Sequence, residues 1–210
     1  MKMEVKIEQT SLKDYSITEN ITREAFWNLY NPGCSEHFIL HLLRESASYI
    51  KELDCIAIVD KKIVGHIIST KAKVIDTQGV NQEVLCIGPF AVLPEFQKHG
   101  IGSKLMNYSI TTAKKLGYKG MILFGNPDYY HRFGFINAEK FKIATRDNQN
   151  FEPFMALELH EKGLTDVHGR FFEDEAFSVK EEDVNEFDRM FPQKEKGNPQ
   201  INISQYEIKP

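Results

Sequence analysis

Cysteine is scarce in this chain, and its three residues, Cys34, Cys55 and Cys86, form no C-x-x-C pair. An odd number of cysteines without that spacing argues against both a disulfide framework and a zinc knuckle. It fits a reducing compartment, where thiols stay free. His37 and His41 lie one helical turn apart, but no third ligand with helpful spacing accompanies them, so we assign no metal site.

Long apolar runs and a basic excess are also missing. No apolar stretch approaches the roughly 18 residues of a membrane-spanning helix, and Met1 to Val5 lack the apolar core of a signal peptide. The formal net charge is −4, so the chain lacks the basic footprint of a nucleic-acid-binding protein. We expect a soluble, cytoplasmic protein that binds neither membrane nor nucleic acid.

The chain does contain enough apolar material for one sizeable core, because 41% of its 210 residues are hydrophobic. We predict a main domain over residues 1–160 and a C-terminal extension over residues 161–210. Within the extension, residues 168–177 suggest an edge strand and residues 194–210 an irregular tail. Between them, Val184, Phe187 and Phe191 have the spacing of the apolar face of an acidic helix.

The most informative stretch runs from Val84 to Leu116. An apolar run, Val84 to Val92, leads into a turn that carries Gly100 and Gly102, and a helical pattern follows from Ile101 to Leu116. A strand–turn–helix of this kind gathers free backbone N–H groups at the positive end of a helix dipole. Such a point suits an anion, most often a phosphate or pyrophosphate.

Three phosphate-binding patterns can be compared with this turn. The P-loop does not fit, because Ser103 precedes Lys104 and no glycine stands five residues before Gly102. The dinucleotide fingerprint G-x-G-x-x-G does not fit either, because it lacks its third glycine. The pattern Q/R-x-x-G-x-G/A does fit, with Gln97, Gly100 and Gly102 at its fixed positions. A turn whose glycines only ease packing is the plain alternative.

The strand before the turn contains a proline. Pro89 cannot donate a ladder hydrogen bond and Gly88 is typical of a bulge, so we expect an edge strand, a bulge or a strand splayed from its neighbour. The unpaired N–H and C=O groups of a splayed strand can bind an amide-rich chain, as a sheet edge binds a peptide. Phe90, Ala91 and Val92 lie where those groups are expected. An ordinary strand end is the alternative.

Hydrophobic periodicity predicts the remaining elements. It indicates strands at 5–7, 54–59, 63–75, 121–124 and 151–159, and helices at 17–30 and 36–49. The polar stretch Asp60 to Lys62 predicts a hairpin turn. Asn126 and Pro127 suit the N-cap and first residue of a short helix that carries Tyr129 and Tyr130 and stops before Gly134.

The segment Tyr129 to Phe135, Y-Y-H-R-F-G-F, resembles the F-Y-x-x-x-G-F segment of the GNAT family of N-acetyltransferases. The Q-x-x-G-x-G turn resembles the acyl-CoA loop of the same family, and the two motifs occur in the expected order and context. Ile87 to Pro94 also resembles a YhbS-like bacterial subgroup. The resemblance covers about residues 5–159 and is densest over 87–135.

The resemblance implies a three-layer α+β fold, with a mixed, mostly antiparallel, centrally splayed sheet flanked by helices. It implies an N-acetyltransferase that moves acetyl from acetyl-CoA to a primary amine by direct attack. Tyr130 is then the catalytic residue, because a tyrosine with a pKa near 10 can donate a hydrogen bond or a proton to a thiolate whose conjugate acid has a pKa of about 8.5. Contacts with acetyl-CoA are assigned to Phe90, Ala91, Val92, Gln97, Lys98, His99, Gly100, Ile101, Gly102, Ser103, Asn126 and Tyr129.

The general base is left open among Glu83, His66, Cys86 and a chain of water molecules. His66 reads more simply as a buried, hydrogen-bonded histidine. Two other functions also stay open: a non-catalytic acyl-CoA-binding sensor or structural module on the same fold, and a different α/β enzyme with a phosphate ligand.

The acceptor cannot be read from the sequence, although residues 20–48 are expected to wall its cleft. From Phe171 to Asp188 eight carboxylates stand against one lysine. We interpret them as a solvated helix face, with an acidic lip that attracts cationic amines as the alternative. A homodimer is an open option.

Overall fold

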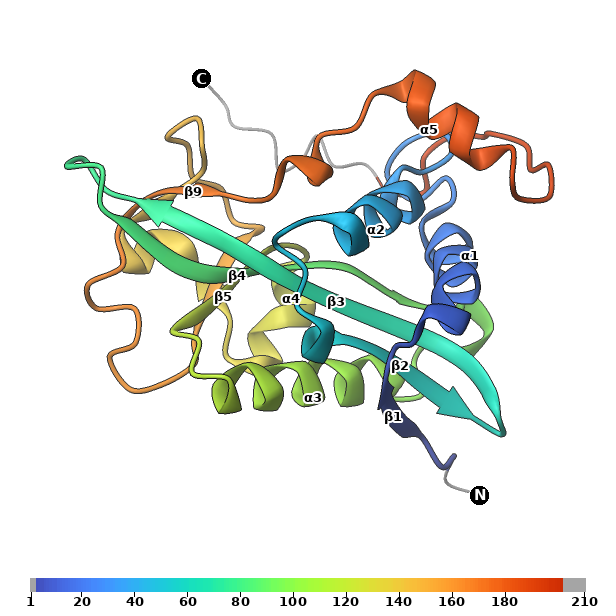
Figure 1. The fold of residues 1–210 in the computed structure, drawn as a ribbon, viewed down its shortest axis with the longest axis horizontal. Coiled ribbons are helices and arrows are strands. Elements are labelled where there is room, and N and C mark those ends of the chain that lie inside the picture. The colour runs from blue at the N-terminus through green and yellow to red at the C-terminus, as the bar shows by residue number, and fades with distance from the viewer. Residues whose placement is uncertain (1–2, 202–210) are drawn as a thin grey trace.

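The computed structural model describes residues 3–201, which form a mixed sheet with helices on both faces (Figure 1). The helices are α1 (Tyr15–Phe26), α2 (Glu36–Glu45), α3 (Ile101–Lys115), α4 (Pro127–Tyr130) and α5 (Glu181–Asp188). The strands are β1 (Lys6–Gln9), β2 (Asp54–Val59), β3 (Lys62–Ile75), β4 (Asn81–Val92), β5 (Gly120–Phe124), β6 (Ile136–Asn137), β7 (Ile143–Ala144), β8 (Phe154–Glu158) and β9 (Gly169–Phe172). None of the described helices is long and apolar enough to cross a membrane.

Among residues 3–201, seven strands follow the order β1-β2-β3-β4-β5-β8-β6, and β9, which lies off this path, pairs with both β3 and β7. Of the strand pairs in the described part of the chain, β4–β5 and β7–β9 are parallel and the others are antiparallel. The predicted mixed, mostly antiparallel sheet is therefore confirmed. The predicted hairpin joins β2 to β3, with Asp60 and Lys61 both at positive φ, as a tight two-residue hairpin turn requires.

The two faces of the sheet are covered by different helices. Leu105, Met106 and Ile110 of α3 pack on one face, in the largest apolar cluster. On the other face Leu40 and Leu43 of α2 pack against Ile68 of β3. Figure 1 shows α3 and α2 on opposite sides of β3, with α5 lying beyond α2. The predicted three-layer arrangement is confirmed.

Several element ends differ from the sequence prediction. The helix expected to reach residue 30 ends at Phe26, because Trp27 leaves helical geometry and Asn28 adopts a positive φ. The next helix ends at Glu45 rather than near Tyr49. There Ser46 turns away, and its hydroxyl donates to Asp174. Two very short strands, β6 and β7, carry too few residues for an alternating pattern to indicate them.

The C-terminal extension contributes both expected elements. The expected strand is β9, but the prediction that it lies at an edge is wrong, because β9 pairs with β3 on one side and with β7 on the other. The expected acidic helix is α5. Residues 194–200 are irregular, as expected for the tail, and residues 202–210 of that tail lie outside the described residues. The domain boundary near residue 160 stays a prediction.

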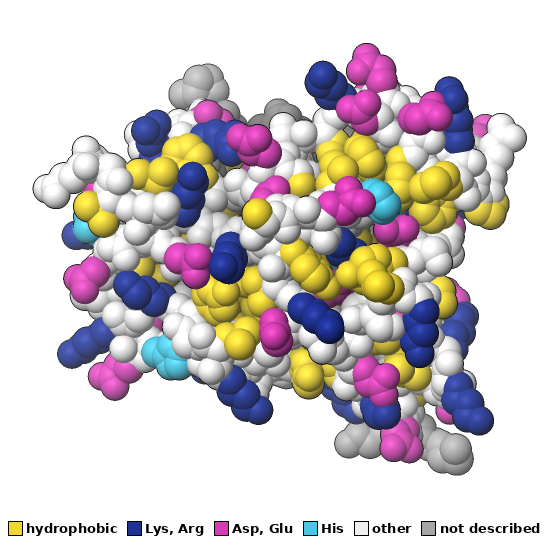
Figure 2. Space-filling view, in the orientation of Figure 1, with side chains coloured by type: hydrophobic (Ala, Val, Ile, Leu, Met, Phe, Trp, Pro, Cys, Tyr) yellow, Lys and Arg dark blue, Asp and Glu magenta, His cyan; other side chains and the backbone are white. Residues whose placement is uncertain are grey.

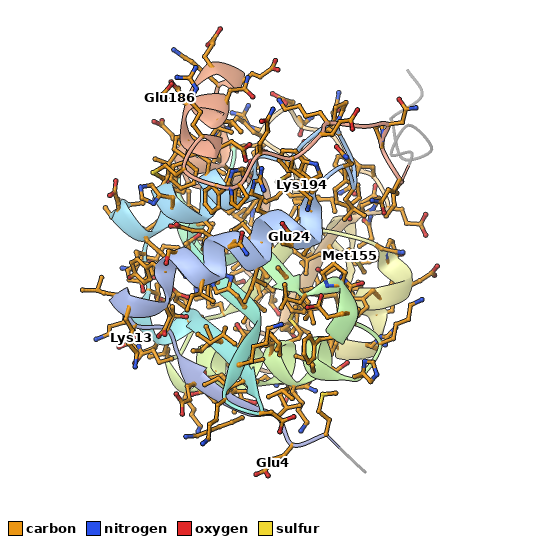
Figure 3. All side chains as sticks on the ribbon, turned by 90° about the vertical axis from the view of Figure 1, so that its right-hand side faces the viewer. Glu4, Lys13, Glu24, Met155, Glu186 and Lys194 are labelled. Carbon is orange, nitrogen blue, oxygen red and sulfur yellow. The ribbon has the colours of Figure 1, made fainter. Side chains whose placement is uncertain are left out.

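A buried ion pair docks α5 against the two N-terminal helices. Arg23, 1% exposed, donates through Nε and Nη2 to the two carboxylate oxygens of Asp188, at 2.6 and 3.0 Å. His37 Nε2 lies 3.1 Å from Asp188 Oδ1. Further along, Lys194 pairs with Glu24 of α1 at 2.7 Å, and Figure 3 shows these two residues together on that side of the molecule. The extension is thus fixed to α1 and α2 by charge as well as by packing.

This docking predicts a pH dependence of stability. Burial lowers the pKa of His37 from 6.5 to about 4, so between these values the unfolded chain binds a proton that the folded chain does not. Stability should fall as the pH drops through that window. Between pH 7 and pH 4, the free energy of unfolding measured in urea should fall by about 3 kcal/mol more for the wild type than for His37→Gln. His160→Gln, at an exposed histidine, is the control and should show the same fall with pH as the wild type. An equal fall in all three proteins would contradict the role given to His37.

Candidate active site

The sheet opens between β4 and β5. Their parallel pairing is limited to Leu85 with Met121 and Cys86 with Ile122. Beyond Cys86 only the other edge of β4 is paired, with Phe90, Ala91 and Val92 opposite Ile67, His66 and Gly65 of β3. The β3–β4 register also shifts between Ile67 and Ser69, opposite Gly88 and Pro89. The predicted bulge and splayed strand are both present, and the edge of residues 87–92 that faces away from β3 has no strand partner among residues 3–201.

The turn after β4 ends in an uncapped helix N-terminus. Gly100, at φ 80°, is the N-cap of α3, and no side chain caps the helix. Lys104 N donates to Gly100 O at 3.1 Å, the first bond of the helix. Helix geometry leaves the preceding amides, those of Ile101, Gly102 and Ser103, without a helical acceptor. These free donors at the positive end of α3 are what an anion requires.

Gly102 is where the two motifs meet. A Cβ built at Gly102 would lie 2.6 Å from the Tyr129 hydroxyl and 3.1 Å from Cζ of Phe90. The rings of Phe90 and Tyr129 lie 6.2 Å apart. Burial raises the pKa of Tyr129, opposed by the Arg132 guanidinium and by a hydrogen bond with Ser103. The structure therefore brings together the strand, the loop and α4, all of which supplied predicted site residues.

Some of the predicted binding residues use their side chains to hold the loops in shape. Gln97 Nε2 donates to Val92 O at 3.0 Å, and His99 Nδ1 lies 2.7 Å from Gln97 O. Asn126 Oδ1 accepts from Asp128 N at 2.9 Å, so its predicted N-cap role is confirmed. Ile101 is buried in the main core and offers only its amide. Lys98 is exposed at φ 63°, with its ammonium in solvent beside the loop.

Tyr130 is the last residue of α4. Its ring packs against Gly125, where an added Cβ would be 2.2 Å from Cε2, and edge-on to Phe135. Burial raises the pKa of Tyr130 well above its usual value, with Tyr129 and Tyr30 adding to the rise. The phenol is therefore protonated at neutral pH and able to donate.

The base candidates lie apart from one another. Glu83 pairs with Lys73, at the end of β4 away from the loop, and lines a separate cavity of about 720 Å³ that contains none of residues 97–103. Cys86 is buried where β4 and β5 part, and burial raises the pKa of its thiol, as do Glu173 and Asp174. Both positions suit a proton acceptor poorly.

His66 sits in a fully buried charge network beneath α1 and α2. Its Nε2 lies 3.0 Å from Asp54 Oδ1, and Arg44 Nε donates to Asp54 Oδ2 at 2.9 Å. Burial lowers the pKa of His66 despite the carboxylate of Asp54. Its Nδ1 has no hydrogen-bond partner within the described part of the chain. The arrangement matches the simpler interpretation of His66, a buried and hydrogen-bonded histidine.

Two neighbours of the site were not singled out by sequence reasoning. Tyr30, from the α1–α2 loop, is close enough to Tyr130 to raise the pKa of its phenol. Phe177, from the C-terminal extension, lies with Cε1 3.7 Å from where a Cβ of Gly88 would be. Both contacts join segments far apart in sequence, and neither residue belongs to a motif.

Residues 18–135, more than half of the chain, match the model of the Acetyltransferase (GNAT) family. The chain belongs to this family. The matched GNAT segment contains both motifs and the open strand, whereas β9, α5 and the tail lie beyond it. Membership agrees with the resemblance that the two motifs indicated.

Curated relatives of this GNAT protein carry the names of uncharacterised N-acetyltransferases. YjhQ of Escherichia coli is 33% identical over 95 residues, which are 44% of this chain and 51% of YjhQ. YhbS of the same species is 24% identical over 136 residues, 64% of this chain and 78% of YhbS. The chain thus spans about half the length of the first relative and more of the second.

Solved GNAT structures share the fold. YhbS of Escherichia coli, in complex with CoA, matches with a TM-score of 0.72 at 22% identity, over 85% of this chain and 93% of that one. A GNAT acetyltransferase of Brucella melitensis, in complex with acetyl-CoA, matches with a TM-score of 0.68 at 24% identity, over 83% and 99% of the two chains.

The burial of the cysteines predicts slow thiol chemistry in the native GNAT protein. Burial raises the pKa of Cys34 and of Cys55 to about 12, and it also raises that of Cys86 well above its usual value. Since the thiolate is the reactive form, Ellman's reagent should modify the native protein at least about tenfold more slowly than the guanidinium-unfolded chain. A thiol that reacts quickly in the native protein would contradict the prediction. Cys34→Ser would then show whether that thiol is Cys34, which is only partly buried.

Proposed function

We propose that this protein transfers the acetyl group of acetyl-CoA to a primary amine by direct attack of the amine on the thioester. The observation that carries the proposal is the pairing of an uncapped α3 N-terminus with the open edge of β4, next to a protonated Tyr130. Family membership and two structural neighbours with CoA or acetyl-CoA in their complexes support the same coenzyme.

The residues of this chain fit the two ends of that coenzyme. The amides of Ile101, Gly102 and Ser103 suit its pyrophosphate, with Lys98, His99 and Gly100 at the mouth of the loop. The open edge of Phe90, Ala91 and Val92 suits the amides of its pantetheine arm, as a sheet edge suits an added strand. Phe90 and Tyr129 lie against Gly102 and leave no room for a side chain there. The backbone of Gly102 therefore stays bare at the start of α3.

Each of these residues then contributes a defined physical effect. Binding at the loop, distant from the thioester, fixes the reacting carbon where the amine arrives. A free N–H of the β4 edge stabilises the oxyanion that forms. Tyr130, whose phenol is protonated at neutral pH, donates a hydrogen bond to the departing thiolate sulfur. The proton lost by the amine goes to water or to one of the open base candidates, of which Glu83 and Cys86 are poorly situated.

Gly100→Glu tests the loop assignment. The added carboxylate would face the pyrophosphate, so the variant should lose the stabilisation that CoA gives the wild type, about 2.7 kcal/mol at 100 times Kd. Gly79→Glu is a matched control: both glycines have a positive φ near 80° and open space around the missing Cβ, but Gly79 lies in the β3–β4 turn. Thermal unfolding with and without CoA provides the measurement. A shift that survives in Gly100→Glu would remove the loop from the binding site.

Tyr130→Phe tests the catalytic assignment. Loss of the hydroxyl should lower kcat about 100-fold, as removal of a general acid does, with little change in acetyl-CoA affinity. Release of CoA from acetyl-CoA is followed over a panel of primary amines. Tyr108→Phe, on the exposed side of α3, should behave as the wild type. An unchanged rate in Tyr130→Phe would exclude the tyrosine from the mechanism.

A non-catalytic acyl-CoA-binding module is the second candidate, and the same two measurements separate it from the enzyme. A module would be stabilised by CoA and would release none from acetyl-CoA with any amine of the panel. Stabilisation by ATP or NAD in place of CoA would instead favour a different phosphate-ligand enzyme.

A further inference from the structure

A cleft of about 420 Å³ opens between the α1–α2 loop and the C-terminal extension. The loop side of its lining comes from residues between Phe26 and Glu36, and the extension side is Val179, Glu181, Val184, Asn185 and Lys196. The volume is in the range of small-molecule sites. The extension side, five of the thirteen lining residues, lies beyond residue 135, the end of the family match.

The cleft adjoins the candidate active site at two points. Tyr30 lines the cleft and is close enough to Tyr130 to raise its pKa. Phe177 precedes Val179 by two residues, and it lies against Gly88, where β4 has already left β5. The segment that forms one wall of the cleft therefore begins directly over the open strand.

We define residues 174–201 as the strap, because they are held at intervals along their length. Asp174 accepts from Ser46 and from the amide of Ala176 at the start. In the middle Asp188 binds Arg23, and the ring of Phe187 packs on Phe38 and His41 of α2. Figure 2 shows hydrophobic side chains gathered where α2 meets α5.

The end of the strap is bonded to the α1–α2 loop itself. Trp27 Nε1 donates to Glu195 O at 2.9 Å, and the amides of Gln200 and Ile201 donate to Asn28 O and Leu29 O, at 2.9 and 2.8 Å. The loop and the strap thus hold each other, and the cleft between them has two fixed walls.

The lining combines an apolar body with carboxylates. Its apolar residues are Phe26, Tyr30, Pro32, Val179 and Val184. Two carboxylates, those of Glu36 and Glu181, belong to the same lining, against one lysine, Lys196, whose Nζ donates to Asn185 Oδ1 at 2.8 Å. Because the carboxylates outnumber the lysine, a cation with an apolar substituent matches this wall better than an anion does.

We propose that the strap forms one wall of the acceptor site, and that this site takes a primary amine carried on a compact apolar body. The inference rests on the proposed acetyl transfer and adds to it the substrate class. Val179 is then a specificity-determining residue, and Phe177 positions the strap over Gly88.

The test is direct binding of amines to the CoA-loaded protein, in which no acetyl group is available to react. Titration calorimetry with 2-phenylethylamine and ethanolamine compares an apolar with a polar substituent on the same amine. The wild type should bind 2-phenylethylamine at least tenfold more tightly. Val179→Ala should weaken it about tenfold, the effect of one or two methylenes in an apolar pocket. Phe177→Ala should weaken it as well, because the strap loses its contact with Gly88. Neither variant should change the binding of ethanolamine.

Met190→Ala is the matched control, because Met190 also belongs to the strap but is 68% exposed and does not line the cleft. An unchanged stabilisation by CoA shows that each variant is folded. Equal affinity for the two amines, or an affinity that neither strap variant changes, overturns the inference.

Release of CoA from acetyl-CoA with 2-phenylethylamine separates this inference from the proposed function. Selective binding without release in the wild type would overturn acetyl transfer and leave the cleft assignment intact. If CoA is released but Val179→Ala and Phe177→Ala leave the KM for 2-phenylethylamine unchanged, acetyl transfer stands and the assignment of the strap is overturned.

Discussion

The loss of pairing between β4 and β5 after Cys86 is the constraint on which the rest of the site depends. A parallel pair that continued would use the backbone groups of both strands and fill the middle of the sheet. Because it stops after two residue pairs, β4 keeps one free edge while β3 holds the other in register. The uncapped start of α3 and the tyrosine-bearing α4 then lie against each other beside this strand, where Gly102 meets Tyr129 and Phe90.

Much of this arrangement follows from local chemistry and could be predicted from the sequence. Gly88 and Pro89 indicated an interrupted ladder, Gly100 a positive φ at a helix start, and Asn126 with Pro127 a capped helix. Each prediction concerns neighbours in the chain, where the covalent structure limits the options. Strand and helix types were likewise predicted for the long elements, because their apolar residues repeat with the period of the element.

The remaining features depend on contacts between distant segments, which no local pattern encodes. The early end of α1 coincides with bonds from Trp27 and Asn28 to residues near 195. The contact of Phe177 with Gly88 joins positions that belong to no shared motif. The tight fit of Tyr129 against Gly102 brings the two motifs into contact, yet neither motif alone specifies that contact. Whether Glu83 or Cys86 can act as the general base depends on where each lies relative to the opening of the sheet. That position follows from the strand register of β4, which the sequence does not specify.

The ion pair between Arg23 and Asp188 spans 165 residues and is buried on the arginine side. A ribosome makes the chain from its N-terminus, so α1 emerges long before its carboxylate partner has been synthesised. During that interval the guanidinium stays in water, since burying it alone is costly. Arg23 of α1 therefore reaches its final packing only after Asp188 has been synthesised, and a chain that stops before Asp188 leaves the guanidinium without this partner.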